Sequence, residues 1–147
     1  MNYDILVNGQ DLHSFGDLES FESAIPEIET LEIEGLDVVV FSDEHYFIYE
    51  FFKSWNTYHS NEQKIIAYYA EARGYDLIDD IDTIKEEAID NFLGVYEDER
   101  EAVKELFKLS LSNSDYESIE WILTPNVVEA ISVSQLTMYN DYYYLWN

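Results

Sequence analysis

The 147-residue chain contains no cysteine, five glycines, two prolines and only seven basic residues. Without cysteine it can form no disulfide bond, thiolate metal site or thiol nucleophile, and it suits a reducing compartment. So few glycines and prolines leave little sequence for a flexible linker. The longest uncharged apolar runs, residues 38–41 and 142–146, are far shorter than the roughly 20 residues that span a bilayer. The first residues also lack the basic and apolar regions of a signal peptide, so we expect none.

Hydrophobic and acidic side chains are what the sequence has in abundance. Hydrophobic residues make up 47% of it and aromatic residues 16%, which supplies ample apolar surface to offset the entropy of folding. Strong acidity alone would otherwise favour disorder. A chain of this length can bury one good core or about two to three small ones, so we expect a folded protein.

The distribution of charge is more informative than its total. Thirty-two acidic residues give a formal net charge of −25, yet no Lys or Arg occurs before Lys53 or after Lys108. The first 52 residues carry thirteen carboxylates and the last 39 carry five, in both cases without a basic residue. Such a chain would be repelled by nucleic acid and by anionic membranes, so we expect neither as a direct partner. A basic protein is the class of partner that this charge favours.

Hydrophobic periodicity, helix caps and turn residues predict an elongated α+β fold with small antiparallel β-sheet lobes and an acidic helical middle. We expect a β-rich N-terminal lobe at 1–58, a helical middle at 59–91 and a C-terminal α+β lobe at 92–147. Strands are expected at 3–8, 30–34, 37–41, 92–96 and 142–146, and helices at 18–25, 43–58, 61–73, 79–91, 97–111, 115–123 and 125–131.

Local signals mark the ends of these elements. They are a turn at Asn8-Gly9, caps at Asp17 and Asp115, a capping box of Ser60 with Gln63, a helix stop at Gly74, and Pro125 at the start of a helix. The apolar face of the helix at 43–58 is expected to consist of Phe47, Ile48, Phe51, Phe52 and Trp55.

A first row of carboxylates lies on the expected strand at 30–34. Side chains two residues apart on a strand project from one face at about 6.6 Å spacing. Glu32 and Glu34 therefore point outward at roughly the separation of successive phosphates in a nucleic-acid strand, and Glu27 and Glu29 repeat the interval just before. An ordinary solvated strand face is the alternative explanation for this segment.

The helix at 79–91 carries a second row. One stripe of this helix consists of Asp79, Asp82, Glu86 and Asp90, and the opposite side consists of Ile81, Ile84, Ala88 and Phe92. Like charges four residues apart destabilise a helix by about 0.2–0.5 kcal/mol per pair, and Lys85 is the one base here that relieves them. A partner-binding role and an ordinary solvated face both account for this stripe.

Acidic residues also open the helix at 97–111. Glu97, Asp98 and Glu99 lie in its first turn, where the helix dipole favours negative charge, so capping is the simpler explanation for them. The bases Arg100, Lys104 and Lys108 are expected to pair with Glu97, Glu101 and Glu105, each three residues earlier. We add Glu97, Asp98 and Glu101 to the two rows as candidate partner-binding residues.

These segments together resemble the antirestriction proteins of the ArdA family, which are DNA mimics carried by phages and conjugative elements. The resemblance is diffuse and covers most of the chain: a β-rich start with 37–43, an acidic helical middle, and residues 94–99 leading into an amphipathic helix. Pro125, Val128 and Ile131 loosely match the family's C-terminal motif, and Val133 stands where the family has an aspartate. The resemblance implies a homodimer in the bacterial host cytoplasm that occupies the DNA groove of type I restriction–modification enzymes.

Three other interpretations stay open at this point. A related mimic could block a CRISPR effector, whose basic channel poses the same electrostatic problem. An acidic adaptor or immunity protein could bind a basic partner that does not handle nucleic acid. An ordinary acidic domain, or one adapted to high salt, would need no such partner.

The sequence carries no recognisable catalytic motif. His13, His45 and His59 lack a metal-binding spacing, and the patterns GxSxG, GxxxxGK[ST] and GxGxxG do not occur. We therefore expect no enzyme, no metal site and no cofactor. The tyrosine-rich segment at 139–146 is expected either to pack one aromatic row on the core or to form an exposed aromatic edge for association.

Overall fold

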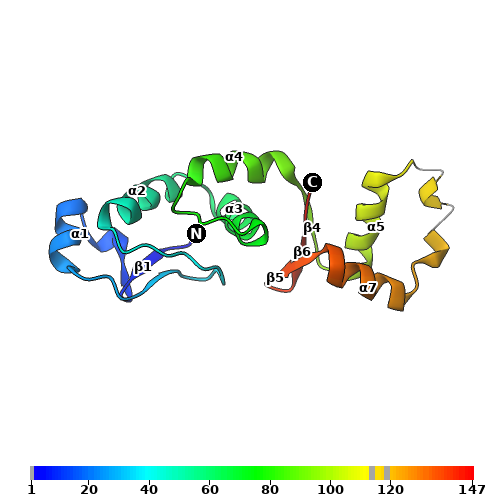
Figure 1. Cartoon of the computed structure of the whole chain (residues 1–147), viewed down its shortest axis with the longest axis horizontal. Coiled ribbons are helices and arrows are strands. Elements are labelled where there is room, and N and C mark those ends of the chain that lie inside the picture. Colours follow the sequence, from blue (N-terminus) through cyan, green and yellow to red (C-terminus); the bar gives the residue numbers. More distant parts are fainter. Residues whose placement is uncertain (1, 113–114, 118–119) are drawn as a thin grey trace. The chain divides into compact units, whose positions relative to one another are not determined.

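The computed structural model describes residues 2–112, 115–117 and 120–147, apart from the side chains of 110, 133–135 and 137 (Figure 1). The chain forms two compact units, Met1–Asp90 and Asn91–Asn147. Each unit contains a three-stranded antiparallel sheet together with helices, so the fold is α+β as expected. We describe the two units one after the other.

The sheet of the first unit consists of β1 (Ile5–Val7), β2 (Gln10–Asp11) and β3 (Leu31–Ile33), in the order β2-β1-β3. Asn8 and Gly9 join β1 to β2 with φ angles of 50° and 78°, the positive values that the predicted tight turn requires. Ile5, Val7 and Ile33 are buried on one face of the sheet. The expected strands at 3–8 and 30–34 are therefore present in shorter form.

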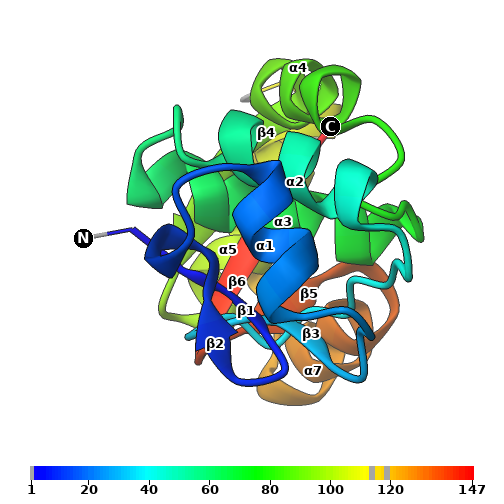
Figure 2. The same ribbon diagram turned by 90° about the vertical axis from the view of Figure 1, so that its left-hand side faces the viewer.

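The first unit continues with the 3₁₀ helix η1 (Leu12–Ser14), α1 (Leu18–Ala24), α2 (His45–Trp55), α3 (Ser60–Arg73) and α4 (Ile81–Asn91). Asp17 caps α1 as predicted, because its Oδ1 accepts a hydrogen bond of 2.8 Å from the Ser20 amide. Gly74 ends α3 in the left-handed conformation, also as predicted. Helix α1 lies against α2 (Figure 2). At this contact the Phe21 and His45 ring centroids are 5.0 Å apart.

The capping box at α3 involves different residues from those we predicted. His59 is the N-cap, and Glu62 rather than Gln63 bonds back to the cap backbone. Gln63 is fully buried instead: its Oε1 accepts from the Tyr3 amide at 3.0 Å, and its Nε2 donates to the Trp55 carbonyl at 2.9 Å. These bonds tie residues expected in separate lobes, 1–58 and 59–91, into the single first unit.

Two further expectations for the first unit are wrong. Residues 37–41 form no strand; Val40 is buried, but Val39 and Phe41 are 77% and 74% exposed. Both edges of β1 are already paired, by β2 and by β3, so this β-branched segment has no place beside the central strand. In α2 the residues Ile48, Phe51, Phe52 and Trp55 are buried as expected, but Phe47 is half exposed.

The second unit consists of β4 (Phe92–Tyr96), α5 (Glu99–Ser110), η2 (Glu120–Ile122), α7 (Pro125–Gln135), β5 (Thr137–Tyr139) and β6 (Tyr142–Trp146). Its core cluster comprises Val103, Leu123 and Val128, with Phe107, Ile131 and Leu136 packed against them. Pro125 begins α7 as predicted, whereas β5 was not foreseen. The helix expected at 115–123 lies partly outside the described residues; at its start the Ser112 hydroxyl, not Asp115, accepts the backbone bond.

The tyrosine-rich strand β6 is the central strand of this second sheet, which has the order β4-β6-β5. Tyr144 and Leu145 are buried, and the rings of Tyr144 and Trp146 stack at 5.7 Å. The expectation of an aromatic row packed on the core is confirmed, and the alternative of an aromatic sheet edge is wrong. The turn before β6 holds Asn140 and Asp141 at positive φ.

Candidate functional site

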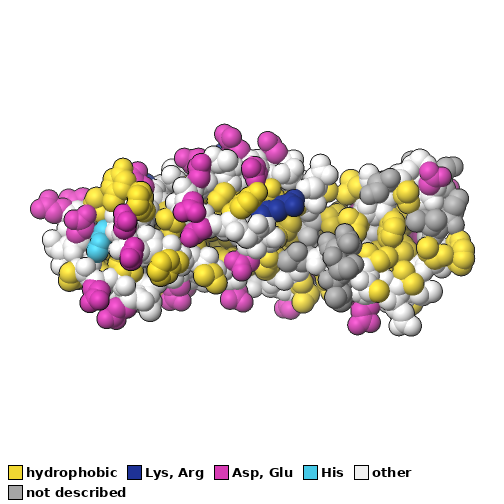
Figure 3. All heavy atoms as spheres, viewed as in Figure 1, with side chains coloured by type: hydrophobic (Ala, Val, Ile, Leu, Met, Phe, Trp, Pro, Cys, Tyr) yellow, Lys and Arg dark blue, Asp and Glu magenta, His cyan; other side chains and the backbone are white. Residues whose placement is uncertain are grey.

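Negative charge is concentrated in the first unit. That unit has 22 carboxylates and four bases, a formal charge of −18, whereas the second has ten carboxylates and three bases, a formal charge of −7. On the face shown in Figure 3, carboxylates lie over α1 and along α4 with hydrophobic side chains between them. The eleven candidate partner-binding residues are all exposed: Glu27, Glu29, Glu32, Glu34, Asp79, Asp82, Glu86, Asp90, Glu97, Asp98 and Glu101.

The bases are confined to helices. All seven lie on α2, α3, α4 or α5, and four of them lie over tyrosine rings. The distances from the charged group to the ring centroid are 5.9 Å for Lys53 over Tyr49, 5.1 Å for Arg73 over Tyr69, 5.3 Å for Lys85 over Tyr58 and 5.3 Å for Lys108 over Tyr116. Aromatic rings are therefore recurrent cation partners in this chain.

The solvent face of the first sheet collects four carboxylates. Leu6 on β1 lies opposite Glu32 on one side and Asp11 on the other, and the Glu34 amide donates to the Asp4 carbonyl at 2.8 Å. Because alternate residues share a face, the side chains of Asp4, Asp11, Glu32 and Glu34 point away from the buried face. Glu32 and Glu34 were anticipated. Asp4 and Asp11 were missed, since only the strand register brings them there.

Glu27 and Glu29 lie before β3 in an irregular segment rather than on the strand. The Asn8 side chain fixes this segment: its Nδ2 donates to the Glu27 carbonyl at 2.8 Å, and its Oδ1 accepts from the amides of Glu29 and Thr30 at 2.7 and 2.9 Å. The turn residue Asn8 thus holds the backbone of both candidate acids in a defined position.

On α4 the predicted stripe is one residue shorter. Asp79 precedes the helix, and Asp80 bonds the Thr83 amide at 3.2 Å, so the helical row consists of Asp82, Glu86 and Asp90 at four-residue intervals. Ile81, Ile84 and Ala88 are buried on the opposite side as expected, while Phe92 belongs to β4.

Asp82 also has a structural contact, because it accepts a 2.6 Å hydrogen bond from the Tyr58 hydroxyl. Burial, followed by this hydrogen bond, raises the pKa of Tyr58 well above its ordinary value. Glu86 and Asp90 remain candidate partner-binding residues of the row.

Several acids of the second unit take part in local interactions. Asp98 is the N-cap of α5 and accepts from the Arg100 amide at 2.8 Å, which supports the capping explanation. The expected pairs Lys104–Glu101 and Lys108–Glu105 form at 3.5 and 3.4 Å. Arg100 does not pair with Glu97 but donates to the carbonyl of Leu123. The first unit is therefore the stronger candidate for the partner-binding surface.

One group of side chains has the composition of a cation site. The ligand atoms of Asp4, Asp11 and His13 lie within 4.8 Å of one another, a cluster that sequence spacing did not reveal. His13 Nδ1 is 2.9 Å from Asp11 Oδ1 and 3.7 Å from Asp4 Oδ1. Carboxylate oxygens with one imidazole could hold a divalent cation, but the His13–Asp11 hydrogen bond already accounts for this arrangement.

Each unit has a cavity among its described residues. One of about 420 Å³ adjoins the acidic sheet face and is lined by Asn2, Tyr3, Asp4, Glu34, Gly35 and Ser60. The other, of about 520 Å³, is lined by Glu99, Pro125, Glu129, Ser132, Leu136, Met138 and Tyr143. Among the helices that the structure describes, none combines the length and apolarity that a membrane span needs.

The chain was compared with protein-family models, with curated proteins and with solved structures. None of the three comparisons found a match.

Proposed function

We propose that the chain is a non-catalytic inhibitor that mimics nucleic acid and occupies the DNA-binding cleft of a bacterial defence enzyme. The observation that carries this proposal is the exposure of all eleven candidate carboxylates in a protein whose bases are confined to four helices. The acidic side chains of a folded protein with a net charge of −25 repel one another and destabilise the fold. Binding to a partner of opposite charge would explain why the chain carries so many of them.

The spacing of the acids supports mimicry over a merely acidic surface. Successive members of the α4 row are about 6 Å apart along the helix axis, since four residues rise about 1.5 Å each. Side chains two apart on a strand, such as Glu32 and Glu34, have a similar spacing of about 6.6 Å. Duplex DNA carries one negative charge per ~1.7 Å of its axis, and enzymes that bind DNA contact these charges with rows of Lys and Arg. Ordered carboxylates would satisfy the same basic cleft without any matching of sequence.

The target we favour is a type I restriction–modification enzyme, in line with the resemblance to ArdA-type mimics. A CRISPR effector is the alternative target, because its channel is also built to bind a nucleic-acid backbone. Either assignment places the protein with phages or mobile elements and in the host cytoplasm, where such enzymes act.

The direct test is competition. The purified protein is added to a type I restriction–modification complex, and separately to a Cas effector, and binding of a labelled DNA duplex is measured. We expect DNA and inhibitor to exclude each other, with binding that weakens steeply from roughly 0.05 to 0.2 M salt. If the protein bound a target without displacing DNA, mimicry would be wrong, and an acidic adaptor would be the better description.

A pair of charge-matched variants tests the role of the α4 row. Glu86→Lys with Asp90→Lys reverses two exposed acids but leaves Asp82 and its bond to Tyr58 intact. Glu19→Lys with Glu22→Lys reverses two exposed acids of α1, which are not in the candidate set, and alters the net charge equally. We expect the first pair to raise the inhibitory concentration at least several-fold more than the second. Equal effects would show that overall charge, not this row, matters.

A further inference from the structure

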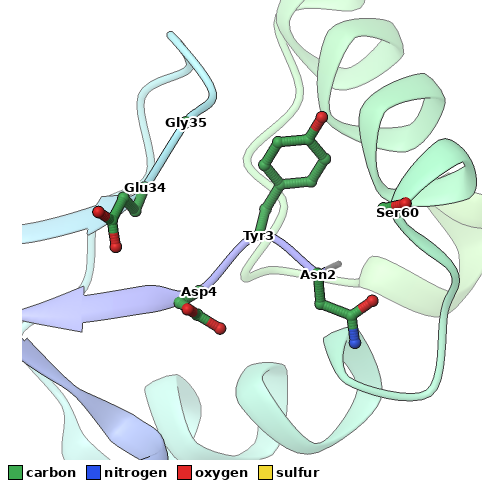
Figure 4. A pocket seen from close by; sticks show the side chains of 6 residues that line it. All are labelled: Asn2, Tyr3, Asp4, Glu34, Gly35 and Ser60. Carbon is green, nitrogen blue, oxygen red and sulfur yellow. The ribbon is translucent and has the colours of Figure 1, made fainter.

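The cavity of about 420 Å³ in the first unit has an aromatic wall beside two carboxylates. Figure 4 shows the Tyr3 ring between Gly35 and the start of α3, with the Asp4 carboxylate below it and Glu34 in the turn that follows β3. The cavity volume lies at the lower end of the roughly 300–1,000 Å³ range of ligand pockets. It suits one side chain or a small cation better than a large ligand.

The backbone of the aromatic wall is fixed from both sides. The Tyr3 amide donates to Gln63 Oε1 at 3.0 Å, and the Tyr3 carbonyl accepts from Trp55 Nε1 at 2.7 Å. Gln63 and Trp55 are both completely buried. Buried polar groups are costly unless they are bonded, and here both serve to hold one residue at the cavity. The site is thus organised before any ligand arrives.

The position of the ring depends on Gly35. This residue has φ of +89°, and a Cβ placed on it would lie 3.1 and 3.3 Å from two ring carbons of Tyr3. Only glycine therefore lets the chain turn after β3 while the Tyr3 ring packs against it. The same turn carries Glu34, whose amide donates to the Asp4 carbonyl at 2.8 Å, so ring and carboxylates form one connected group.

The chemistry of this group is that of a receptor for a planar cation. A guanidinium can stack on a tyrosine ring and donate paired hydrogen bonds to a carboxylate, whereas the ammonium of lysine is a compact and more strongly hydrated point charge. Elsewhere in the chain four tyrosine rings each have a basic side chain over them. The described part of the chain brings none of its own Lys or Arg to the Tyr3 ring.

We propose that this cavity binds the guanidinium group of an arginine that projects from the basic partner. The proposal rests on the proposed function, because the arginines that grip phosphates in a DNA cleft would face an acidic mimic. Tyr3 provides the stacking surface, and Asp4 and Glu34 provide the counter-charge. This contact would fix the orientation of the protein in the cleft, which dispersed surface charge cannot do.

The test uses a probe that does not require the partner. The protein labelled with ¹⁵N is titrated with N-acetylarginine amide, and in parallel with N-acetyllysine amide and with sodium chloride at equal ionic strength. We expect saturable shifts of the Tyr3, Gly35 and Ser60 amides with the arginine probe and clearly weaker binding of the lysine probe. Shifts that are linear, equal for both probes and spread over all acidic elements would overturn the proposal.

Variants locate the binding. Tyr3→Leu removes the ring face and Glu34→Gln removes one charge, and each should weaken the arginine probe by about threefold or more. Glu22→Gln, which removes the same charge from an exposed acid of α1 outside the candidate set, should leave its affinity unchanged. Because Glu34 is exposed, Glu34→Gln keeps the test valid even if Tyr3→Leu impairs folding. Equal affinities of Glu34→Gln and Glu22→Gln would refute the assignment.

The two proposals fail in different ways. Arginine binding at Tyr3 together with no competition against DNA would support the cavity and contradict mimicry. Competition against DNA that persists unchanged in Glu34→Gln, with no saturable arginine binding, would support mimicry and overturn the cavity.

Discussion

Replacing Gln63 with leucine should destabilise the first unit by an amount that the structure lets us estimate. The side chain is fully buried and makes two bonds, to the Tyr3 amide at 3.0 Å and to the Trp55 carbonyl at 2.9 Å. The Trp55 carbonyl keeps a second donor in Gln63→Leu, because the Tyr58 amide bonds it at 3.2 Å. The Tyr3 amide has no such substitute among its described contacts. The free energy of unfolding should therefore fall by the cost of about one buried hydrogen-bonding group without a partner, ~1–3 kcal/mol.

The measurement is a urea titration followed by the amide resonances of the first unit, because the two units need not unfold together. With a slope of about 2 kcal/mol per molar urea, the midpoint should fall by roughly 0.5–1.5 M. Gln10→Leu is the matched control, since Gln10 is exposed on β2 and should change the free energy of unfolding by less than about 0.5 kcal/mol. If both variants shifted the midpoint equally, the buried amide would not have the role we give it.

Three further predictions concern the same unit. Gly35→Ala should lower the free energy of unfolding by about 1–2 kcal/mol because of its positive φ and the nearby Tyr3 ring, whereas Gly16→Ala, which meets nothing within 4 Å, should not lower it. The hydrogen bond from the Ser20 amide lowers the pKa of Asp17. The stabilising effect of this carboxylate should therefore be complete above pH 3.8 and be lost as the pH falls below that value. Asp17→Ala should have a lower urea midpoint near neutral pH, and that midpoint should lack this pH dependence. Burial and the hydrogen bond to Asp82 raise the pKa of Tyr58 above 10.0. The stabilising effect of the Tyr58 hydroxyl should therefore hold below pH 10 and be lost above it, because Tyr58 ionises first in the unfolded chain. Ultraviolet titration of tyrosinate would refute this if Tyr58 ionised at its ordinary pKa.

Features that depend on neighbouring residues were predictable from the sequence. The Asn8-Gly9 turn, the Asp17 cap and the Gly74 stop all act within a few positions of the chain, and each is where the sequence places it. The strand at 142–146 also followed from local pattern, whereas the choice between its two aromatic arrangements needed the sheet order. The exposure of the candidate acids was predictable for the same reason, because carboxylates on an amphipathic element face away from its apolar side.

Features that depend on distant residues were not predictable in this way. Gln63 matches a capping-box pattern, but its partner Tyr3 lies 60 positions away, and that contact decides its role. Asp4 and Asp11 join the acidic sheet face only through strand register. The segment 37–41 has strand-like residues, yet a strand also needs an edge to pair with, and propensity cannot say whether one is free.

The restriction of every lysine and arginine to α2, α3, α4 and α5 has a consequence for digestion by proteases. Trypsin cleaves after these residues and must bind its substrate in an extended form. At six of the seven sites the native chain offers it only peptide bonds held within helices, whereas the Arg73–Gly74 bond lies at the end of α3. Tryptic cuts would then record the opening of individual helices rather than the accessibility of loops. An enzyme that cleaves after glutamate, by contrast, meets exposed irregular backbone at Glu27 and Glu29 in the native state.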